Sequence, residues 1–321
     1  MKICAIVVTF KRLNLLKKTL NALLKQKKLN DIIIVINGSP DEILNYFKKF
    51  NYKKISNSLL KIDNFKTSNK NLFIKVKYQN SGSAGGFYEG IKLGYNLNYD
   101  WLWLMDDDIE PVKDALEILL SYTSSKIKCV HAKRKFLNGE EVPLGIMIDP
   151  KTSQIINYDP FKYLKRDFCE LGDGCWEGML IHRDVVKQIG FPDKKFYFYN
   201  EDAYYGYLAS KYTMNILINK YLYIKNVKPK FVEIPIFNIK IFRPKSDVIY
   251  YYWIRNKFLL LDKIKKEGNL SRTAYLILIK DLVLTLGAIL ILDRSLKRLF
   301  YFFRGIFDGL RKRYGRGFYR W

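Results

Sequence analysis

The chain of 321 residues carries 56 Lys and Arg against 31 Asp and Glu, a formal net charge of +25, and 49% of its residues are apolar. That apolar fraction excludes global disorder, and the length suits one large α/β domain or a domain of roughly 250 residues with an appendage. The four cysteines form no CxxC pair, which argues against a disulfide framework and favours a reducing compartment.

The excess of positive charge is compatible with several partners. Nucleic acid, an anionic membrane surface or a phosphorylated substrate would each be attracted by it, and composition does not choose among them. Lysine-rich usage that follows genome base composition would also produce it. The first residues, MKICAIVVTFKR, hold only a short apolar run before charge, which indicates a first β-strand rather than a signal peptide.

The first 125 residues predict one half of a doubly wound α/β sheet. Residues 3–9 form a β-branched apolar run, 13–26 carry leucines at helical spacing, and 31–36 are an almost continuous apolar run. This order of strand, helix and strand is a βαβ unit. Strands that are apolar throughout indicate a parallel sheet that is covered on both faces.

The second part of this half continues the pattern. A polar stretch over 41–71 is expected to hold a helix and a variable excursion, and residues 72–78 alternate as a strand. Residues 80–95 predict a glycine-rich turn that leads into a helix, and 100–105 predict another strand. Pro111 is expected in the first turn of a helix that ends near Tyr122.

Beyond residue 125 the pattern is less regular. Residues 126–200 predict mixed strands and loops, 201–212 a helix that acids open, and 248–265 an aromatic and then amphipathic segment. Gly268 and Asn269 mark a break before a tail of different character.

Three adjacent acids, Asp106, Asp107 and Asp108, follow the apolar strand WLWLM. Residues i and i+2 of an extended segment point the same way, so Asp106 and Asp108 can converge on a Mg²⁺ or Mn²⁺ ion while Asp107 points elsewhere. The alternative is a solvated acidic turn that favours the start of the next helix. Ligands of doubly wound sheets bind beyond the carboxyl ends of the strands, and this position favours a site.

Two further segments are ambiguous by themselves. The glycines Gly82, Gly85 and Gly86 lack the spacing of a dinucleotide fingerprint or a P-loop, and they fit either a turn that needs positive φ or a backbone close to a phosphate. Glu201 and Asp202 fit either a general base or the acids that commonly begin a helix.

Seven segments in this order, IVVTFKR, IIIVINGS, NSGSAGGFYEG, WLWLMDDDIEP, CWEGMLI, FYFYNEDAYYGY and YYYWIRN, resemble glycosyltransferase family 2. The similarity covers roughly residues 1–258 and is greatest to galactofuranosyl- and rhamnosyltransferase-like members. It implies a GT-A fold, a Rossmann-like nucleotide-binding sheet flanked by helices. It also implies inverting, metal-dependent transfer from a UDP- or dTDP-sugar to a hydroxyl of a lipid-linked or cell-surface glycan, with Mn²⁺ or Mg²⁺ as the cofactor.

The resemblance also assigns roles to residues that match the motifs. The nucleotide-sugar site would comprise Thr9, Phe10, Arg12, Asn37, Asn80, Gly85, Gly86, Asp106 and Asp107. Asn37 would contact the base, and Asp106 and Asp108 would bind the metal. Trp176 and Glu177 would line the acceptor side, where a tryptophan face can pack on a sugar.

The same resemblance makes Asp202 the catalytic base, with Glu201 beside it. Arg255 and Asn256 match an Arg-Asn pair whose role the sequence does not give. Relatives often supply a histidine metal ligand after the base, but His131 and His182 both precede Asp202. Either the metal has fewer protein ligands or another residue, such as Glu233 or Asn238, substitutes.

The tail combines apolar, basic and aromatic residues. Lys280 and Asp281 interrupt the apolar stretch 275–292, and the run from Leu282 is only about half of the ~20 residues that span a bilayer. From Arg294 to Trp321 basic and aromatic residues interleave, which is typical of an interfacial helix on anionic lipid. Packing on the enzyme or on a second subunit is the alternative, and RNA binding lacks any recognisable motif.

We therefore expect a GT-A glycosyltransferase domain over residues 1–265 and a C-terminal helical, basic-aromatic extension over 266–321. The expected partners are a nucleotide-sugar, a glycan or lipid-linked acceptor, an anionic membrane surface and a second copy of the chain, with no nucleic acid. The expected location is the inner face of the cell membrane, as a peripheral cytoplasmic protein. The rival hypothesis is a basic membrane- or nucleic-acid-binding protein on a catalytically degenerate α/β scaffold.

Overall fold

The computed structural model of the protein describes residues 1–143, 147–148, 155–156, 166–228, 231–234, 239–242, 246–267, 270 and 272–317. Its main sheet contains β1 (Ile3–Thr9), β2 (Asp31–Asn37), β3 (Lys53–Ser56), β4 (Leu59–Ile62), β5 (Asn71–Lys77), β6 (Trp101–Asp106), β7 (Ile109–Pro111), β8 (Ile127–Phe136), β11 (Phe168–Glu170), β12 (Met179–His182) and β13 (Met214–Lys225). Two short hairpins pair β9 (Met147–Ile148) with β10 (Ile155–Ile156) and β14 (Phe231–Ile234) with β15 (Ile239–Phe242).

The helices fall into those that cover the sheet and those of a C-terminal layer. The first group is α1 (Leu13–Leu24), α2 (Asp41–Phe47), the 3₁₀ turn η1 (Phe65–Thr67), α3 (Gly82–Asn96), α4 (Ala115–Ser121), α6 (Arg183–Ile189) and α7 (Glu201–Ser210). The second is α8 (Asp247–Lys266), α9 (Arg272–Ala288), the π-helical η2 (Ile289–Asp293) and α10 (Leu296–Leu310).

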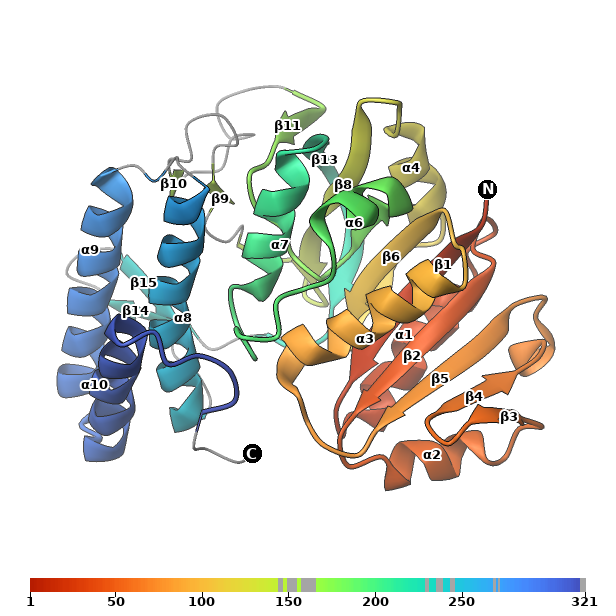
Figure 1. Ribbon diagram of the computed structural model, residues 1–321, viewed down its shortest axis with the longest axis horizontal. Coiled ribbons are helices and arrows are strands. Elements are labelled where there is room, and N and C mark those ends of the chain that lie inside the picture. Colours follow the sequence, from red (N-terminus) through yellow and green to blue (C-terminus); the bar gives the residue numbers. More distant parts are fainter. Residues whose placement is uncertain are drawn as a thin grey trace.

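The predicted parallel half is confirmed. Strand β1 lies between β2 and β6, and all three run parallel, with β5 parallel to the far side of β2. The spatial order is β11-β13-β8-β12-β6-β1-β2-β5-β4-β3, and β7 pairs with β13 (Figure 1). The carboxyl ends of β1, β2, β5 and β6 therefore meet at one edge of the sheet, where ligands of such folds bind.

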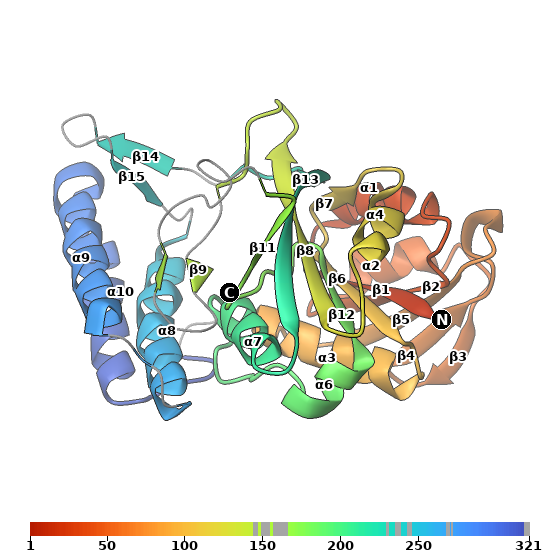
Figure 2. The same ribbon diagram turned by 90° about the horizontal axis from the view of Figure 1, so that it is seen from above.

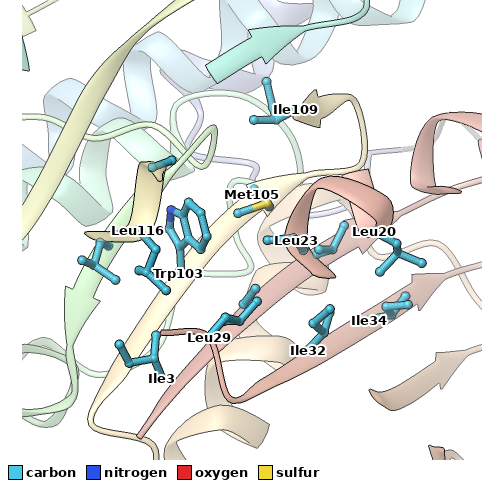
Figure 3. Packing of buried hydrophobic residues seen from close by; sticks show 14 of the residues in the cluster. Ile3, Leu20, Leu23, Leu29, Ile32, Ile34, Trp103, Met105, Ile109 and Leu116 are labelled. Carbon is cyan, nitrogen blue, oxygen red and sulfur yellow. The ribbon is translucent and has the colours of Figure 1, made fainter. Parts of the chain in front are cut away.

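Side chains of β1 alternate between two buried clusters, one on each face of the sheet. Ile3, Ala5 and Val7 pack with leucines of α1, as Figure 3 shows for part of this cluster. The intervening residues of β1 pack on the other face, against α3, α6 and α7. Burial on both faces explains why the strand is apolar throughout, because no position of it faces water.

The predicted start of the helix at Pro111 is wrong. Residues Ile109–Pro111 form β7, which pairs antiparallel with Tyr223–Lys225 of β13, and α4 begins only at Ala115. The pairing is non-local, so no pattern near Pro111 announces it. The excursion over 41–71 contains α2 and the antiparallel hairpin β3–β4, and all four residues of β3 are exposed at the outer end of the described sheet.

The C-terminal helices α8, α9 and α10 lie side by side, with α7 between them and the sheet in both views (Figures 1 and 2). Polar contacts join the three. Lys257 of α8 binds Asp281 of α9 at 2.6 Å, and Tyr251 of α8 donates to Asp308 of α10 at 2.9 Å. At the start of α8, Asp247 binds Arg298 of α10 at 2.8 Å. The helix α8 thus packs with α9 and α10 on one side and, through Leu259 and Leu260, with Tyr204 and Tyr207 of α7 on the other.

The segment Arg272–Asp293 is longer and more continuous than the sequence analysis expected. It forms a helical run of 22 residues with a mean hydropathy of 2.3, which by length and composition is enough to cross a membrane. Asp281 interrupts the apolar sequence but not the helix, and its charge is paired with Lys257.

Candidate active site

The acidic turn after β6 separates its three carboxylates into two groups. Asp107 is completely buried and faces α1, where Thr9 Oγ1 donates to its Oδ2 at 2.6 Å and Arg12 Nη2 lies 2.7 Å from its Oδ1. Burial raises the pKa of Asp107 to about 6 in spite of the Arg12 charge. Asp107 thus holds the ends of β1 and β6 together, and Thr9 and Arg12 are engaged with it.

Asp106 and Asp108 form the second group. Burial, then the charges of Asp108 and Glu177, raise the pKa of Asp106 well above its usual range. Asp108 is 4% exposed, and its Oδ1 has no hydrogen-bond partner among the residues described. Arg12 Nη1 lies 3.4 Å from the other oxygen, Oδ2. This is a concentration of negative charge that a cation would relieve.

The donor set of this pair fits a hard divalent cation. Carboxylate oxygens suit Mg²⁺ or Mn²⁺, which commonly bind one or two carboxylates and complete their coordination with phosphates and water. Within the described ranges no group of three or more His, Cys, Asp or Glu is placed to hold a metal. A cation here would therefore depend on oxygens of a bound ligand as well as on Asp106 and Asp108.

The remaining candidates for a third ligand differ in what they contact. His131 is buried in β8, beside the Cys129 thiol, and burial with the Arg134 charge lowers its pKa to about 3. His182 begins α6, where its Nδ1 accepts from the Asp184 amide at 3.2 Å. Asn238 lies outside the described residues, and Glu233 lies in β14, of whose side chains the structure gives no description.

The Asn37 side chain holds the turn before α3. Its Nδ2 donates to Gly82 O at 2.7 Å, and its Oδ1 accepts from the Ser81 amide and hydroxyl at 3.1 and 2.9 Å. Asn80 Oδ1 accepts from the Gly82 amide at 2.8 Å in the same turn. Contact between Asn37 and a base, as the resemblance implies, would have to displace these bonds.

The glycines of this turn serve close packing. Gly82 has φ +71, and a Cβ there would lie 1.8 Å from the Tyr197 carbonyl oxygen. A Cβ at Gly86 would lie 2.5 Å from Val8 of β1, and one at Gly85 2.3 Å from the Ser81 hydroxyl. Small residues therefore let α3 begin directly against β1 and against the segment that precedes α7.

Glu201 and Asp202 begin α7 and differ in their environments. Glu201 is 3% exposed, and its Oε1 accepts hydrogen bonds from Trp176 Nε1 at 3.2 Å and from the Ser83 hydroxyl. Burial and the Asp202 charge raise the pKa of Glu201 to about 8. Burial also raises the pKa of Asp202, to about 6, against the hydrogen bond from the Ala203 amide. Near neutral pH the pair then holds a protonated Glu201 and an ionised Asp202.

The Trp176 ring is not placed as the sequence analysis expected. It is 3% exposed and stacks on Phe87 of α3 with ring centroids 4.4 Å apart. That face is covered by protein, so it cannot pack on a sugar in this structure. What Trp176 does contribute is the indole N–H that Glu201 accepts.

Glu177 occupies a position between the acidic turn and α7. It forms ion pairs with Arg134 of β8 and Lys225 of β13. Burial would raise the pKa of Glu177, but the charges of Lys225 and Arg134 outweigh it and hold the value at about 2. The Glu177 charge in turn raises the pKa of both Asp106 and Asp202, which places it within electrostatic reach of both groups.

Sequence reasoning missed Ser83, Arg134, Asp173 and Lys225. Burial and the Asp202 charge raise the pKa of Asp173 well above its usual range. Lys225 is likewise close enough to Asp106 and Asp108 for their charges to raise its pKa. Arg134 and Lys225 lie in the generally basic strands β8 and β13, where nothing in the sequence distinguishes them from their neighbours. Asp173 could have been found only from its nearness to the CWEG motif.

The site thus contains an acid pair at the strand ends, Asp106 and Asp108, and a second acid pair with separated pKa values at α7. Two cations, Arg134 and Lys225, interact with both groups through Glu177. Such an arrangement can bind a phosphorylated ligand through a cation and remove a proton from a neighbouring hydroxyl.

Comparison with known proteins gives a consistent result. The model for "Glycosyl transferase family 2" matches residues 4–190. The galactofuranosyltransferase GlfT1 of Mycolicibacterium smegmatis is 28% identical over 129 residues. That alignment covers 40% of this chain and 35% of the relative, so the match spans about a third of the relative's length.

Solved structures with the same fold share little sequence. S. aureus TarS 1-349 in complex with UDP superposes with a TM-score of 0.59 at 16% identity, over 97% of this chain and 80% of that chain. The mannosyltransferase PcManGT from Pyrobaculum calidifontis, in complex with GDP-Man and Mn²⁺, gives 0.54 at 10% identity, over 97% and 88%. These similarities identify the GT-A fold.

Proposed function

Because the chain belongs to glycosyltransferase family 2, we propose that it transfers a sugar from a nucleoside-diphosphate donor to a hydroxyl of a lipid-linked or cell-surface glycan, with inversion. The observation that carries this proposal is the pair at the start of α7. Asp202, with a pKa of about 6, is ionised at neutral pH, and it lies near the same Glu177 that reaches Asp106.

In this mechanism Asp202 accepts the proton of the acceptor hydroxyl as that oxygen attacks the anomeric carbon. The bond from that carbon to the diphosphate breaks on the opposite face, so one displacement inverts the configuration. Glu201 remains protonated and holds Trp176 and Ser83. A carboxylate that is ionised but not strongly acidic suits this proton transfer, because its pKa lies close to the working pH.

Asp106 and Asp108 would hold the divalent cation. When bound, that cation would offset the negative charge that develops on the leaving diphosphate. Lys225 adds a protein cation on the same side, because its charge interacts with both acids. Arg12, 42% exposed at the side chain, is the basic residue that lies open at the mouth of the turn.

The donor we propose is a UDP- or dTDP-sugar such as UDP-galactofuranose or dTDP-rhamnose. Support for galactofuranose comes from the named activity of the M. smegmatis relative, and support for UDP from the TarS complexes. The matching segment includes the strands that end at Thr9, Asn37 and Asp106.

The test is turnover of a panel of UDP-, dTDP- and GDP-sugars with Mn²⁺, with Mg²⁺ and with EDTA. We expect one donor to be consumed with metal and none with EDTA. Asp108→Ala is expected to weaken UDP binding in Mn²⁺, measured by calorimetry. A chain that binds RNA or vesicles but none of these nucleotides would instead support the rival hypothesis of a degenerate scaffold.

We also propose that the extension binds an anionic membrane surface. An apolar face consists of exposed residues of η2 and α10, namely Leu290, Ile291, Leu292, Leu296, Phe300, Phe303, Phe307 and Leu310. Exposed basic residues adjoin it at Arg294, Lys297, Arg311, Lys312, Arg313 and Arg316. Apolar insertion together with basic attraction to lipid phosphate is the combination that interfacial helices use.

The helix run Arg272–Asp293 is proposed to lie along the membrane rather than cross it. Ala274 and Leu278 are buried, and Asp281 is bound to Lys257 of α8. Crossing would carry Lys280 and Asp281 into hydrocarbon and separate α9 from α8, at a high cost for two charges. We propose that the active enzyme lies at the inner face of the cell membrane, where it would meet a lipid-linked acceptor.

Co-sedimentation with vesicles of phosphatidylglycerol or of phosphatidylcholine tests this proposal. We expect the double variant Leu296→Glu/Phe300→Glu to lose binding to the anionic vesicles, since the two residues are 84% and 57% exposed. Ile55→Glu is the matched control, because Ile55 is 56% exposed but lies on β3. Equal binding by all three chains would contradict the proposal. A dimer in gel filtration that the double variant dissociates, without any vesicle binding, would show that a second copy covers the face.

A further inference from the structure

The backbone that delivers Glu201 and Asp202 to α7 has a costly conformation. Tyr197, Tyr199 and Asn200 have φ values of 65, 72 and 65, in the left-handed region that side-chain-bearing residues rarely adopt. Such residues persist only where the surroundings determine them, and they concentrate at functional sites. The residues that stabilise this segment therefore bear on where the two acids lie.

The side-chain amide of Asn256 makes most of the contacts that stabilise this segment. Asn256 Nδ2 lies 2.8, 2.6 and 2.9 Å from the carbonyl oxygens of Phe196, Phe198 and Tyr199, which share its two N–H donors. The Tyr197 carbonyl points the other way and accepts from the Ala84 amide of α3 at 3.2 Å. Four successive carbonyls are thus contacted from two sides, three of them by the completely buried Asn256 amide.

Arg255 links the same segment to the C-terminal part of the chain. Its Nε and Nη2 bind Asn256 Oδ1 at 3.0 and 2.8 Å, which fixes the orientation of the Asn256 amide. Nη2 also donates to Phe196 O at 2.9 Å, and Nη1 donates to Gly315 O at 2.7 Å. The Gly315 amide in turn donates a hydrogen bond to the Lys195 carbonyl oxygen at 2.6 Å. The chain after α10 is therefore hydrogen-bonded to the segment before α7.

We propose that Arg255 and Asn256 are positioning residues, which hold the backbone of residues 196–200 so that Asp202 faces the acceptor hydroxyl, and that residues 315–317 complete this clamp. The inference rests on the proposed function, because it assigns Asp202 as the base. It also gives the C-terminal extension a part in catalysis besides any contact with lipid. A base that is displaced by about 1 Å loses much of its effect on rate, while nucleotide binding at the strand ends does not depend on it.

Asn256→Ala is the direct test, with UDP binding and turnover of the nucleotide-sugar used by the wild type as separate measurements. We expect kcat to fall at least about 100-fold, with the Kd for UDP within about 2-fold of the wild-type value. Arg255→Lys should lower kcat in the same way, because an ammonium cannot reproduce the fork that reaches Asn256, Phe196 and Gly315 at once.

Arg298→Lys is the matched control. Arg298 also joins α10 to α8, through Asp247 at 2.8 Å, but Asp247 is the first residue of α8 and lies about two helical turns before Arg255. It is expected to lower the melting temperature without changing kcat at a temperature well below the transition. If Arg298→Lys lowers kcat as much as Asn256→Ala, the effect is general destabilisation and the clamp is refuted.

A chain that ends at Tyr314 keeps the proposal testable if Asn256→Ala does not fold. It retains α8, α9 and α10 but lacks the Gly315 oxygen that Arg255 binds. We expect this chain to bind UDP as the full chain does, with kcat lowered about 10-fold or more. Wild-type kcat in the truncated chain, or an equal loss of UDP binding and turnover, would overturn the clamp. If the wild type itself consumes no nucleotide-sugar, it is the proposed function that fails.

Discussion

The pH dependence of transfer follows from the burial of Asp202. Burial raises its pKa to about 6, whereas an exposed aspartate titrates near 4. A base acts only when it has lost its proton, so kcat/KM is expected to reach its plateau near pH 7 and to fall with unit slope below pH 6. At pH 5 only about a tenth of Asp202 would be ionised, against about nine-tenths of an unperturbed aspartate, so a roughly tenfold loss of rate is expected.

The assay is kcat/KM for the donor at pH 4.5 to 8, with the Kd for UDP measured over the same range. Asp202→Asn is expected to lose about 10²–10⁴-fold in kcat and to bind UDP as the wild type does. Asp184→Asn serves as the control, since Asp184 binds Lys128 on the surface of α6 and its pKa is lowered, so it does not titrate in this range. A profile that stays flat from pH 5 to 8, or an acid limb that follows UDP affinity alone, would refute Asp202 as the base.

Three further predictions concern stability. Because burial raises the pKa of Glu201 to about 8, the folded state holds a proton that the unfolded state releases near 4.5, and wild-type stability is lost as the pH rises between these values. The melting temperature of Glu201→Gln relative to wild type should therefore increase from pH 5 to pH 8; a constant difference would contradict this. Gly82→Ala should destabilise by about 3 kcal/mol or more in urea unfolding, because its Cβ would meet the Tyr197 oxygen, whereas Gly139→Ala, with positive φ but open space, should cost about 1 kcal/mol. Thr9→Val should cost about 1–3 kcal/mol in the same measurement, because it leaves a buried oxygen of Asp107 without its donor; a cost below 0.5 kcal/mol would show that water replaces the hydroxyl.

Much of the fold could be predicted because its signals are local. The strands β1, β2 and β6 are apolar on every residue that faces a helix layer, and α1 carries leucines at helical spacing. Pro111 shows the limit of such reasoning. Its segment forms a strand because it pairs with β13, which lies more than 100 residues later in the chain.

The site likewise contains features that local sequence predicts and features that depend on distant segments. The position of the acidic turn beyond β6 was predicted from strand order, because the carboxyl ends of parallel strands meet at one edge. The contacts of Trp176 were not, since Phe87 reaches it from α3 and Glu201 from α7. Arg134 and Lys225 belong to the site only because β8 and β13 bring them to Glu177. In a sequence rich in lysine, nothing local indicates which basic residues will form these ion pairs.

The exposed strand β3 carries part of the chain's positive charge, and that part has a structural explanation that requires no ligand. It is the outermost strand of the described sheet, and an outermost strand offers backbone groups on which another chain can pair. Its sequence, KKIS, places two lysines on a stretch of four residues, and a short, charged strand is a poor template for such growth. Replacing Lys53 and Lys54 by threonine would leave the active site untouched and produce a chain that aggregates during folding. A fraction of the +25 charge would then serve to keep copies of this sheet apart.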